Sequence, residues 1–195
     1  MNKKITKFNL CKFYLSFVSI IYIWCLPLLS KIGFCEPDST SISQFIANPQ
    51  ATGALGAVSF FPIILINEYQ DICINKENTK ILNFTLIVFE IMYGLFLTCP
   101  VTYAPILLHQ FCVGGFSLSF IIHSYYVLHY IQLNKITQVL LCITSSTLLL
   151  LAFIDSNHMI YWLLECISFT GILLFTPIDW YLYKKKDNNN YESLL

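Results

Sequence analysis

The sequence has few charged residues and no arginine. Only 11% of its 195 residues are charged, whereas ordinary soluble domains carry about 25%. All 11 basic residues are Lys, and 11 acidic residues balance them, so the formal net charge is zero. This balance excludes a basic nucleic-acid-binding protein, an acidic disordered tail and a polybasic surface protein as descriptions of the whole chain.

The sequence also lacks the spacings that mark the common metal sites. Its eight Cys include no CxxC pair, and its four His form no H-x-x-x-H or H-E-x-x-H motif. Zinc sites use such spacings, so the sequence predicts no metal and no cofactor. Inside apolar helices a free Cys packs as a small hydrophobic residue. Cys35 and Cys99 fall at the same predicted membrane edge, where a disulfide in an oxidising compartment is an open alternative.

What the chain has in abundance is apolar sequence. Hydrophobic residues make up 56% of it and aromatic residues 16%, and the mean hydropathy is +0.66. A bilayer core about 30 Å thick needs about 20 apolar residues in a helix, and no stretch shows the two-residue alternation of a membrane β-strand. The sequence predicts an all-α, polytopic membrane protein, with a single integral membrane domain over residues 1–195. Its six helical spans are expected at about 10–29, 51–66, 81–99, 105–131, 138–154 and 159–183.

The first two stretches admit alternatives. Lys3, Lys4 and Lys7 precede the first stretch, as they would in a cleaved signal peptide. Its apolar run is long for a signal peptide, and no small-x-small cleavage site follows, which favours a retained helix. The second stretch is short and contains Pro62, so a buried or re-entrant segment is the alternative there. Its small residues favour close helix packing and hence a span.

The lysines predict the orientation of the chain. With six spans, ten of the 11 lysines fall on the side that holds both chain ends, and Lys31 alone falls on the other side. Cytoplasmic loops carry the excess of lysine, so both termini are expected in the cytoplasm. Residues 184–195 are expected to form a flexible cytoplasmic tail. In this tail, Tyr191 and Leu194 fit the tyrosine-x-x-hydrophobic pattern of endosomal sorting signals, a short match that also arises by chance.

Ionisable residues inside the spans are the candidate functional residues, because each one is costly to insert into a bilayer. His109 is expected about one turn inside the non-cytoplasmic end of its span, and Glu165 about two turns inside the same end. At a shared depth they are placed for a charge-assisted hydrogen bond, a proton relay or part of a metal site, with Asp155 and His158 just outside. The favoured alternative is that such groups hold helices together by hydrogen bonds. The other polar candidates are Glu90, His123, His129 and Asp179.

Three segments carry a resemblance to a known family. They are Cys35-Glu36-Pro37 with Ser41-Ile42-Ser43-Gln44 and Pro49 after the first span, Leu108-His109-Gln110 with Gly114-Gly115 in the fourth, and Tyr161-Trp162-Leu163-Leu164-Glu165 with Phe175-Thr176-Pro177-Ile178-Asp179-Trp180 in the sixth. With the order of spans, they resemble the FRAG/DRAM/SFK family of six-helix membrane proteins. Gln44 stands where the DRAM-like loop carries Asp, which argues against a role that needs a carboxylate there. Gly114 and Gly115 are interpreted as packing residues rather than ligand contacts.

The resemblance implies a role in membrane-lipid organisation, GPI-anchor lipid remodelling or autophagy. The implied location is an internal membrane, that of the Golgi, the ER or the endolysosome, and the plasma membrane is an alternative. The resemblance also implies membrane lipids and GPI-anchored substrates as partners, with no nucleic acid, and the sequence favours a protein that is not an enzyme. Two alternatives stay open. One is an intramembrane metal-dependent lipid hydrolase that uses His109, His158, Asp155 and Glu165. The other is a small oligomeric transporter or channel built on Glu90 and the histidines of the fourth span.

Overall fold

The computed structural model describes residues 7–73, 79–102 and 104–192 of the chain. Every regular element in these three ranges is a helix. In chain order the helices are α1 (Lys7–Trp24), α2 (Leu26–Lys31), α3 (Ile42–Phe45), α4 (Pro49–Cys73), α5 (Thr79–Thr98), α6 (Ile106–Tyr130), α7 (Lys135–Leu151) and α8 (Met159–Glu192). The predicted all-α fold is therefore confirmed for the residues that the structure describes.

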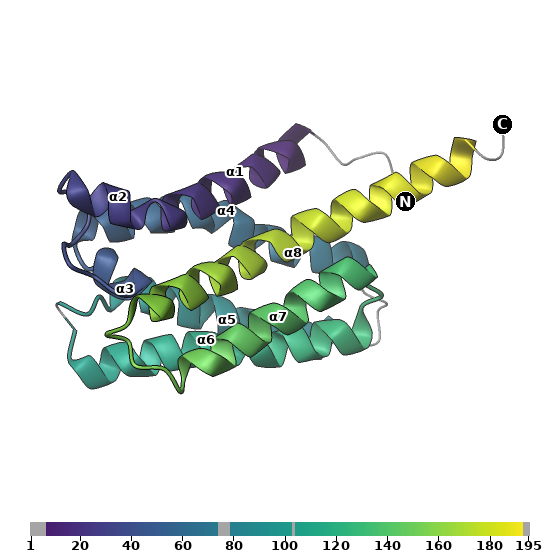
Figure 1. Ribbon diagram of the computed structural model, residues 1–195. Helices are drawn as coiled ribbons and strands as arrows, with labels where there is room; N and C mark the ends of the chain where they lie inside the picture. Colours follow the sequence, from purple (N-terminus) through teal and green to yellow (C-terminus); the bar gives the residue numbers. More distant parts are fainter. Residues whose placement is uncertain (1–6, 74–78, 103, 193–195) are drawn as a thin grey trace.

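The long helices lie side by side in an elongated bundle (Figure 1). α1 begins and α8 ends at one end of this bundle, whereas α2, α3 and the link between α5 and α6 lie at the other end (Figure 1). We call this second end the α3 end. α8 contacts α1, α3, α4 and α7, and therefore links most of the bundle. α6 and α7 touch each other much less than α6 touches α5 or α7 touches α8.

Four helices are long and apolar enough to cross a membrane. Their apolar windows are Pro49–Ile66 in α4, Lys80–Thr98 in α5, Ile106–Tyr130 in α6 and Met159–Leu182 in α8. Two further apolar helices are shorter, Tyr14–Trp24 within α1 and Lys135–Leu151, which is α7. Lengths near 20 apolar residues are those of bilayer-spanning helices. The helices are thus those of an integral membrane protein, and all six predicted stretches contain helix.

The predicted first helix over 10–29 is interrupted at Cys25, between α1 and α2. Pro27 lies in the first turn of α2 and lacks the N–H group that would bond to the Ile23 carbonyl, four residues earlier. The Sγ atom of Cys166 on α8 approaches that carbonyl instead, at 4.0 Å. The break therefore has a local cause, and α8 packs against the carbonyl that the proline leaves free.

Pro62, by contrast, leaves α4 unbroken. Its missing N–H frees the carbonyl of Val58, four residues earlier. The Ser19 hydroxyl of α1 donates to this carbonyl at 2.7 Å. A bilayer core offers no water as a replacement donor, so a neighbouring side chain has to satisfy the freed group. The same bond joins α1 to α4.

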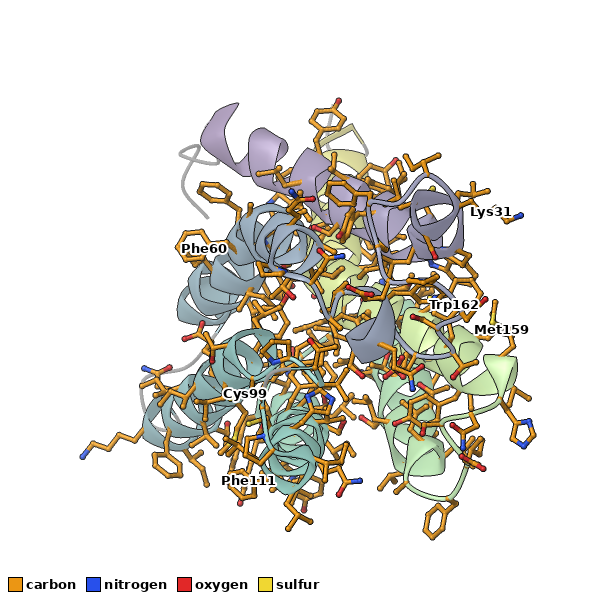
Figure 2. The ribbon with its side chains drawn as sticks, turned by 90° about the vertical axis from the view of Figure 1, so that its left-hand side faces the viewer. Lys31, Phe60, Cys99, Phe111, Met159 and Trp162 are labelled. Carbon is orange, nitrogen blue, oxygen red and sulfur yellow. The ribbon has the colours of Figure 1, made fainter. Side chains whose placement is uncertain are left out.

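The outer surface of the bundle is apolar. On α5, Phe84, Ile87 and Ile91 are 67%, 51% and 55% exposed, and their spacing of three and four residues places them on one helix face. In the view along the bundle, Phe60 of α4 and Phe111 of α6 also lie on the outside (Figure 2). On a soluble protein an apolar surface of this extent would mark an interaction site. On helices of membrane length it is the surface that faces lipid.

Small and hydroxyl-bearing residues pack α7 closely against α8. The Ser168 hydroxyl donates to Thr147 Oγ1 at 2.8 Å. Gly171 lies so close to Thr144 that an added Cβ atom would stand 1.7 Å from Thr144 Oγ1. Close approach through small residues and interhelical hydroxyl bonds is typical of membrane helix pairs. The packing role that the sequence favours for polar residues in spans is thus filled here by Ser and Thr.

α8 continues to Glu192, beyond the predicted end of the sixth span at residue 183. No Gly or Pro follows Pro177 in the sequence, so no strong helix breaker ends the helix earlier. The side chain of Tyr191 and the whole of Leu194, which form the predicted sorting signal, lie outside the described part of the chain.

Candidate functional site

A cavity of about 570 Å³ lies between α6 and α7 at the α3 end of the bundle. This volume falls in the range of about 300–1,000 Å³ that is typical of small-molecule sites. The walls come from α6, α7 and the first turn of α8, and from α3 and its flanking residues. The weak contact between α6 and α7 leaves the space that the cavity occupies.

The cavity is polar at the α3 end and mainly apolar along the helices, where Ser117 of α6 also lines it. Ser41, Ser43 and Gln44 supply hydroxyl and amide groups at the α3 end. Leu118 of α6 and Leu149 of α7 line the apolar part, and they are 57% and 51% exposed. The apolar part therefore opens on the lipid-facing surface of the bundle.

The sequence Ser41-Ile42-Ser43-Gln44 forms a short helix that caps itself. Ser41 is the N-cap residue, and its Oγ accepts the N–H of Gln44 at 3.2 Å. The Gln44 side chain reaches back, and its Oε1 accepts the N–H of Thr40 at 2.8 Å. This reciprocal arrangement is close to a capping box, in which residues of one helical turn satisfy each other's backbone groups. It holds the Ser41 and Ser43 hydroxyls at the wall of the cavity.

Glu165 fixes this segment to α8. Its Oε2 accepts the N–H of Ile42 at 2.5 Å, and both residues are buried. The N–H groups of a first helical turn have no partner within their own helix, so the Glu165 carboxyl supplies the missing acceptor. A second bond, from Thr40 Oγ1 to the Ser156 carbonyl at 2.5 Å, ties the segment to the α7–α8 link. Glu165 is not part of the cavity wall, so it positions the residues that are.

His109 lines the cavity from the first turn of α6. Its Nδ1 lies 2.7 Å from the carbonyl oxygen of Cys99, at the end of α5. A carbonyl oxygen only accepts hydrogen bonds, so Nδ1 carries the proton in this bond, and the neutral form of the ring has its lone pair on Nε2. The bond also fixes the orientation of the ring. The nitrogen left for a ligand is therefore Nε2, as a hydrogen-bond acceptor.

His109 and Glu165 are predicted to lie at one depth, but among the described residues each bonds to a backbone group rather than to the other. Asp155 and His158 are exposed in the α7–α8 link, where Asp155 Oδ1 accepts the N–H of Asn157 at 3.0 Å. Neither of them lines the cavity. In the part of the chain that the structure describes, no three His, Cys, Asp or Glu side chains gather as metal ligands. The four-residue metal site of the hydrolase alternative is therefore not formed.

Asp179 and His123 lie toward the opposite end of the bundle, away from the cavity wall. Asp179 accepts the N–H of Asn134 at 2.7 Å and also a hydrogen bond from the Tyr69 hydroxyl. Because Asn134 is the N-cap residue of α7, this carboxyl joins α4, α7 and α8. The ring of His123 is buried, with Nδ1 3.0 Å from Thr85 Oγ1. Both residues thus hold helices together.

The residues of the transporter alternative do not meet at one place. Glu90 is half-buried on α5 and does not line the cavity. His129 is exposed near the end of α6 and stacks on Tyr125. His109 and His123 stand 14 positions apart on α6, which at about 1.5 Å per residue separates them by about 21 Å along the helix. No shared ligand site joins these residues.

Cys35 and Cys99 do not face each other. Cys35 is buried and hydrogen-bonded with Tyr22, whereas the Cys99 thiol is hydrogen-bonded with that of Cys112. The disulfide alternative between Cys35 and Cys99 is therefore wrong, because each thiol has a different neighbour. Burial raises the pKa of the Cys35 thiol above its ordinary 9.0, the bond with Tyr22 opposes this rise, and the negative charge of Glu36 adds to it.

Two features of the cavity were open to sequence reasoning but not predicted. The pattern Ser41-x-x-Gln44 is a helix-capping signal, and it could have predicted the short helix α3 between the first two spans. Gly114 and Gly115 were both expected to pack. An added Cβ at Gly115 would meet Met92 Sδ at 2.7 Å, which fits packing, whereas nothing lies within 4 Å at Gly114. Gly114 lines the cavity instead, so for this residue the packing interpretation is wrong.

Comparisons of the chain with models of protein families, with curated proteins and with solved structures find no match.

Proposed function

We propose that this membrane protein binds one lipid molecule in the cavity between α6 and α7, with the headgroup at the α3 end. The observation that carries the proposal is the division of the cavity into two parts. Ser43 and Gln44 make one part polar, and the exposed Leu118 and Leu149 make the other apolar and open it toward lipid. A membrane lipid has the same division between a hydrogen-bonding head and an apolar body, so one molecule satisfies both parts.

In the proposed topology α1, α4, α5, α6, α7 and α8 each cross the bilayer once, and both termini are cytoplasmic. α1 has 18 residues and α7 has 17, so at about 1.5 Å per residue they reach about 27 and 26 Å. This is slightly less than a bilayer core of about 30 Å, a mismatch that local thinning accommodates at modest cost. The excess of lysine on one side supports the orientation. The α3 end then lies on the non-cytoplasmic side.

The proposed cellular role follows the resemblance to the FRAG/DRAM/SFK family: membrane-lipid organisation, GPI-anchor lipid remodelling or autophagy in an internal membrane. This role is supported by the positions of the three resembling segments, each of which contributes residues in or beside one cavity. Ser41 and Gln44 from the first segment and His109 from the second line one cavity. Glu165 from the third segment holds Ile42 in place. Residues from all three segments therefore lie in or beside a single site, whereas Asp179 of the third segment lies toward the opposite end of the bundle.

Native mass spectrometry of the purified protein tests lipid binding. Gly114→Phe fills the cavity, because nothing lies within 4 Å of a Cβ atom there and the residue lines the wall. Gly53→Phe is the matched control, since Gly53 is equally open but lies on α4, outside the cavity. We expect one lipid on the wild type and on Gly53→Phe and none on Gly114→Phe. A wild type without lipid, or equal occupancy in all three proteins, would contradict the proposal.

The cellular role is tested separately, in cells that depend on this gene. His109→Ala removes the ring that faces the cavity, and Glu165→Ala removes the acceptor that holds α3. We expect both variants, at wild-type abundance, to change the lipid composition of membranes or of GPI anchors. Unchanged lipid and GPI profiles in both variants would argue against the role that the resemblance implies.

A further inference from the structure

Among the described residues that line the polar end of the cavity, none is acidic and none is a lysine. The hydrogen-bonding groups of this end are the hydroxyls of Ser41, Ser43, Ser156 and Tyr161, the amides of Gln44 and Gln110, and the imidazole of His109. A buried charge is expensive unless an opposite charge pairs with it, whereas a buried hydroxyl needs only hydrogen-bond partners. The lining thus supplies partners for a neutral headgroup and lacks a lysine to pair with a phosphate.

The charges that lie near this end are mainly acidic. Glu36 and Asp38 line a shallow depression beside the cavity, and the two hollows share Gln44 and Val101 as a common wall. Like charges repel each other at the short distances within one end of the bundle. These acidic side chains would therefore repel a negatively charged headgroup.

No described lysine compensates for these acidic groups. Lys31 is the lysine of the α3 end, on α2, and its side chain points outward at the edge of the bundle (Figure 2). Lys80 and Lys135 belong to the opposite end, near the starts of α5 and α7. The field at the mouth of the polar end is therefore unfavourable to an anion.

We infer that the cavity selects a lipid whose headgroup is uncharged and bears a hydroxyl, such as a diacylglycerol or a sterol, over anionic phospholipids. The inference rests on the lipid binding proposed above. In this complex the lipid hydroxyl donates to Nε2 of His109 and accepts from a hydroxyl or amide of the wall. The uncharged lining favours a neutral headgroup over an anionic one, and the acidic side chains nearby strengthen this preference.

Two lipids with the same acyl chains, one with a neutral hydroxyl headgroup and one with an anionic phosphate headgroup, provide the test. Photoactivatable diacylglycerol and photoactivatable phosphatidic acid with the same acyl chains are added to the full-length protein in phosphatidylcholine vesicles, and a photoactivatable sterol forms a third arm. We expect about tenfold more cross-linking with diacylglycerol or the sterol than with phosphatidic acid, and the stronger of the two neutral arms identifies the source. Equal or stronger cross-linking with phosphatidic acid would overturn the inference and leave lipid binding intact. No cross-linking with any lipid would instead overturn the proposed function.

A charge introduced into the lining tests the cause of the preference. Gln110→Lys places a cation in the cavity wall, at an exposed residue. Gln50→Lys is the control, because Gln50 is exposed at the start of α4, outside the cavity. We expect Gln110→Lys to raise cross-linking with phosphatidic acid severalfold and Gln50→Lys to leave it unchanged. An equal rise in both variants, or no rise in Gln110→Lys, would overturn the electrostatic basis of the inference.

Discussion

The Oε2 atom of Glu165 lies 2.5 Å from the backbone nitrogen of Ile42, so a carboxyl on α8 caps the first turn of α3. The two residues are 123 positions apart in the chain. Ile42 belongs to the short segment that carries Ser41 and Ser43 to the cavity wall. Glu165, one of the candidate functional residues, therefore helps to position other residues at the cavity wall.

This relationship predicts the effect of removing the carboxyl. Glu165→Ala leaves the buried N–H of Ile42 without an acceptor and should lower the free energy of unfolding by about 1–3 kcal/mol. Glu165→Gln keeps an oxygen acceptor and should retain most of that stability. Thermal unfolding in detergent, with lipid occupancy by native mass spectrometry, should show that Ala also weakens lipid binding. If Glu165→Ala matched the wild type in both measurements, the bond to Ile42 would have no role.

Asp179 offers a contrasting case at the opposite end of α8. Asp179→Ala removes the acceptor for the Asn134 N–H and for the Tyr69 hydroxyl, and should also lower the free energy of unfolding by about 1–3 kcal/mol. Because these contacts lie away from the cavity, the folded variant should keep its lipid. Loss of lipid from Asp179→Ala at a temperature where it is still folded would contradict a cavity confined to the α3 end.

Gly171 should be the glycine least tolerant of substitution. An added Cβ would stand 1.7 Å from Thr144 Oγ1 and 2.9 Å from Thr144 Cβ, and overpacking of this kind costs about 1–3 kcal/mol. Gly171→Ala should therefore lower the unfolding temperature, whereas Gly53→Ala, with nothing within 4 Å of its added Cβ, should not. Thr144→Ala in the Gly171→Ala background should recover part of the loss. Equal stability of the two single variants would contradict the close packing of α7 on α8.

Cys35 should show a pH-dependent reactivity. The thiolate is the form that reacts with iodoacetamide, and the pKa of this thiol is raised above 9.0 in the folded protein. Alkylation of folded Cys35 should therefore need a higher pH than alkylation of the chain unfolded in SDS. The raised pKa of Cys35 also makes the free energy of unfolding depend on pH. The contribution of this thiol to stability is full below about pH 9 and falls as the pH rises, because the thiol ionises at a lower pH in the unfolded chain than in the folded protein. Identical alkylation profiles in both states, followed by mass spectrometry of the Cys35 peptide, would contradict the burial of this thiol.

The positions of the helices were predictable because the length and polarity of apolar stretches decide them locally. What the prolines do was not predictable in the same way. Pro27 coincides with a break and Pro62 does not, although a neighbouring helix supplies a donor to each freed carbonyl, the Cys166 thiol of α8 for Pro27 and the Ser19 hydroxyl of α1 for Pro62. Whether a neighbouring helix supplies such a donor is a property of the packed bundle.

The residue types of the candidate site were predictable, but their contacts were not. The sequence places His109 and Glu165 at one level, yet the bonds that each makes depend on how α6 and α8 are rotated and on where α3 lies. Gly114 and Gly115 show the same limit, because neighbouring residues on one helix face different directions. One meets the cavity and the other meets Met92.

The most direct test of the account is the position at which a bound lipid touches the chain. Full-length protein in phosphatidylcholine vesicles is irradiated with a diacylglycerol that carries a photoactivatable group in one acyl chain, and the cross-linked residues are mapped by mass spectrometry. We expect cross-links concentrated near Leu118 of α6 and Leu149 of α7, and their loss in Gly114→Phe. Cross-links spread equally over the outer face of α5, at Phe84 and Ile87, and unchanged in Gly114→Phe would contradict it.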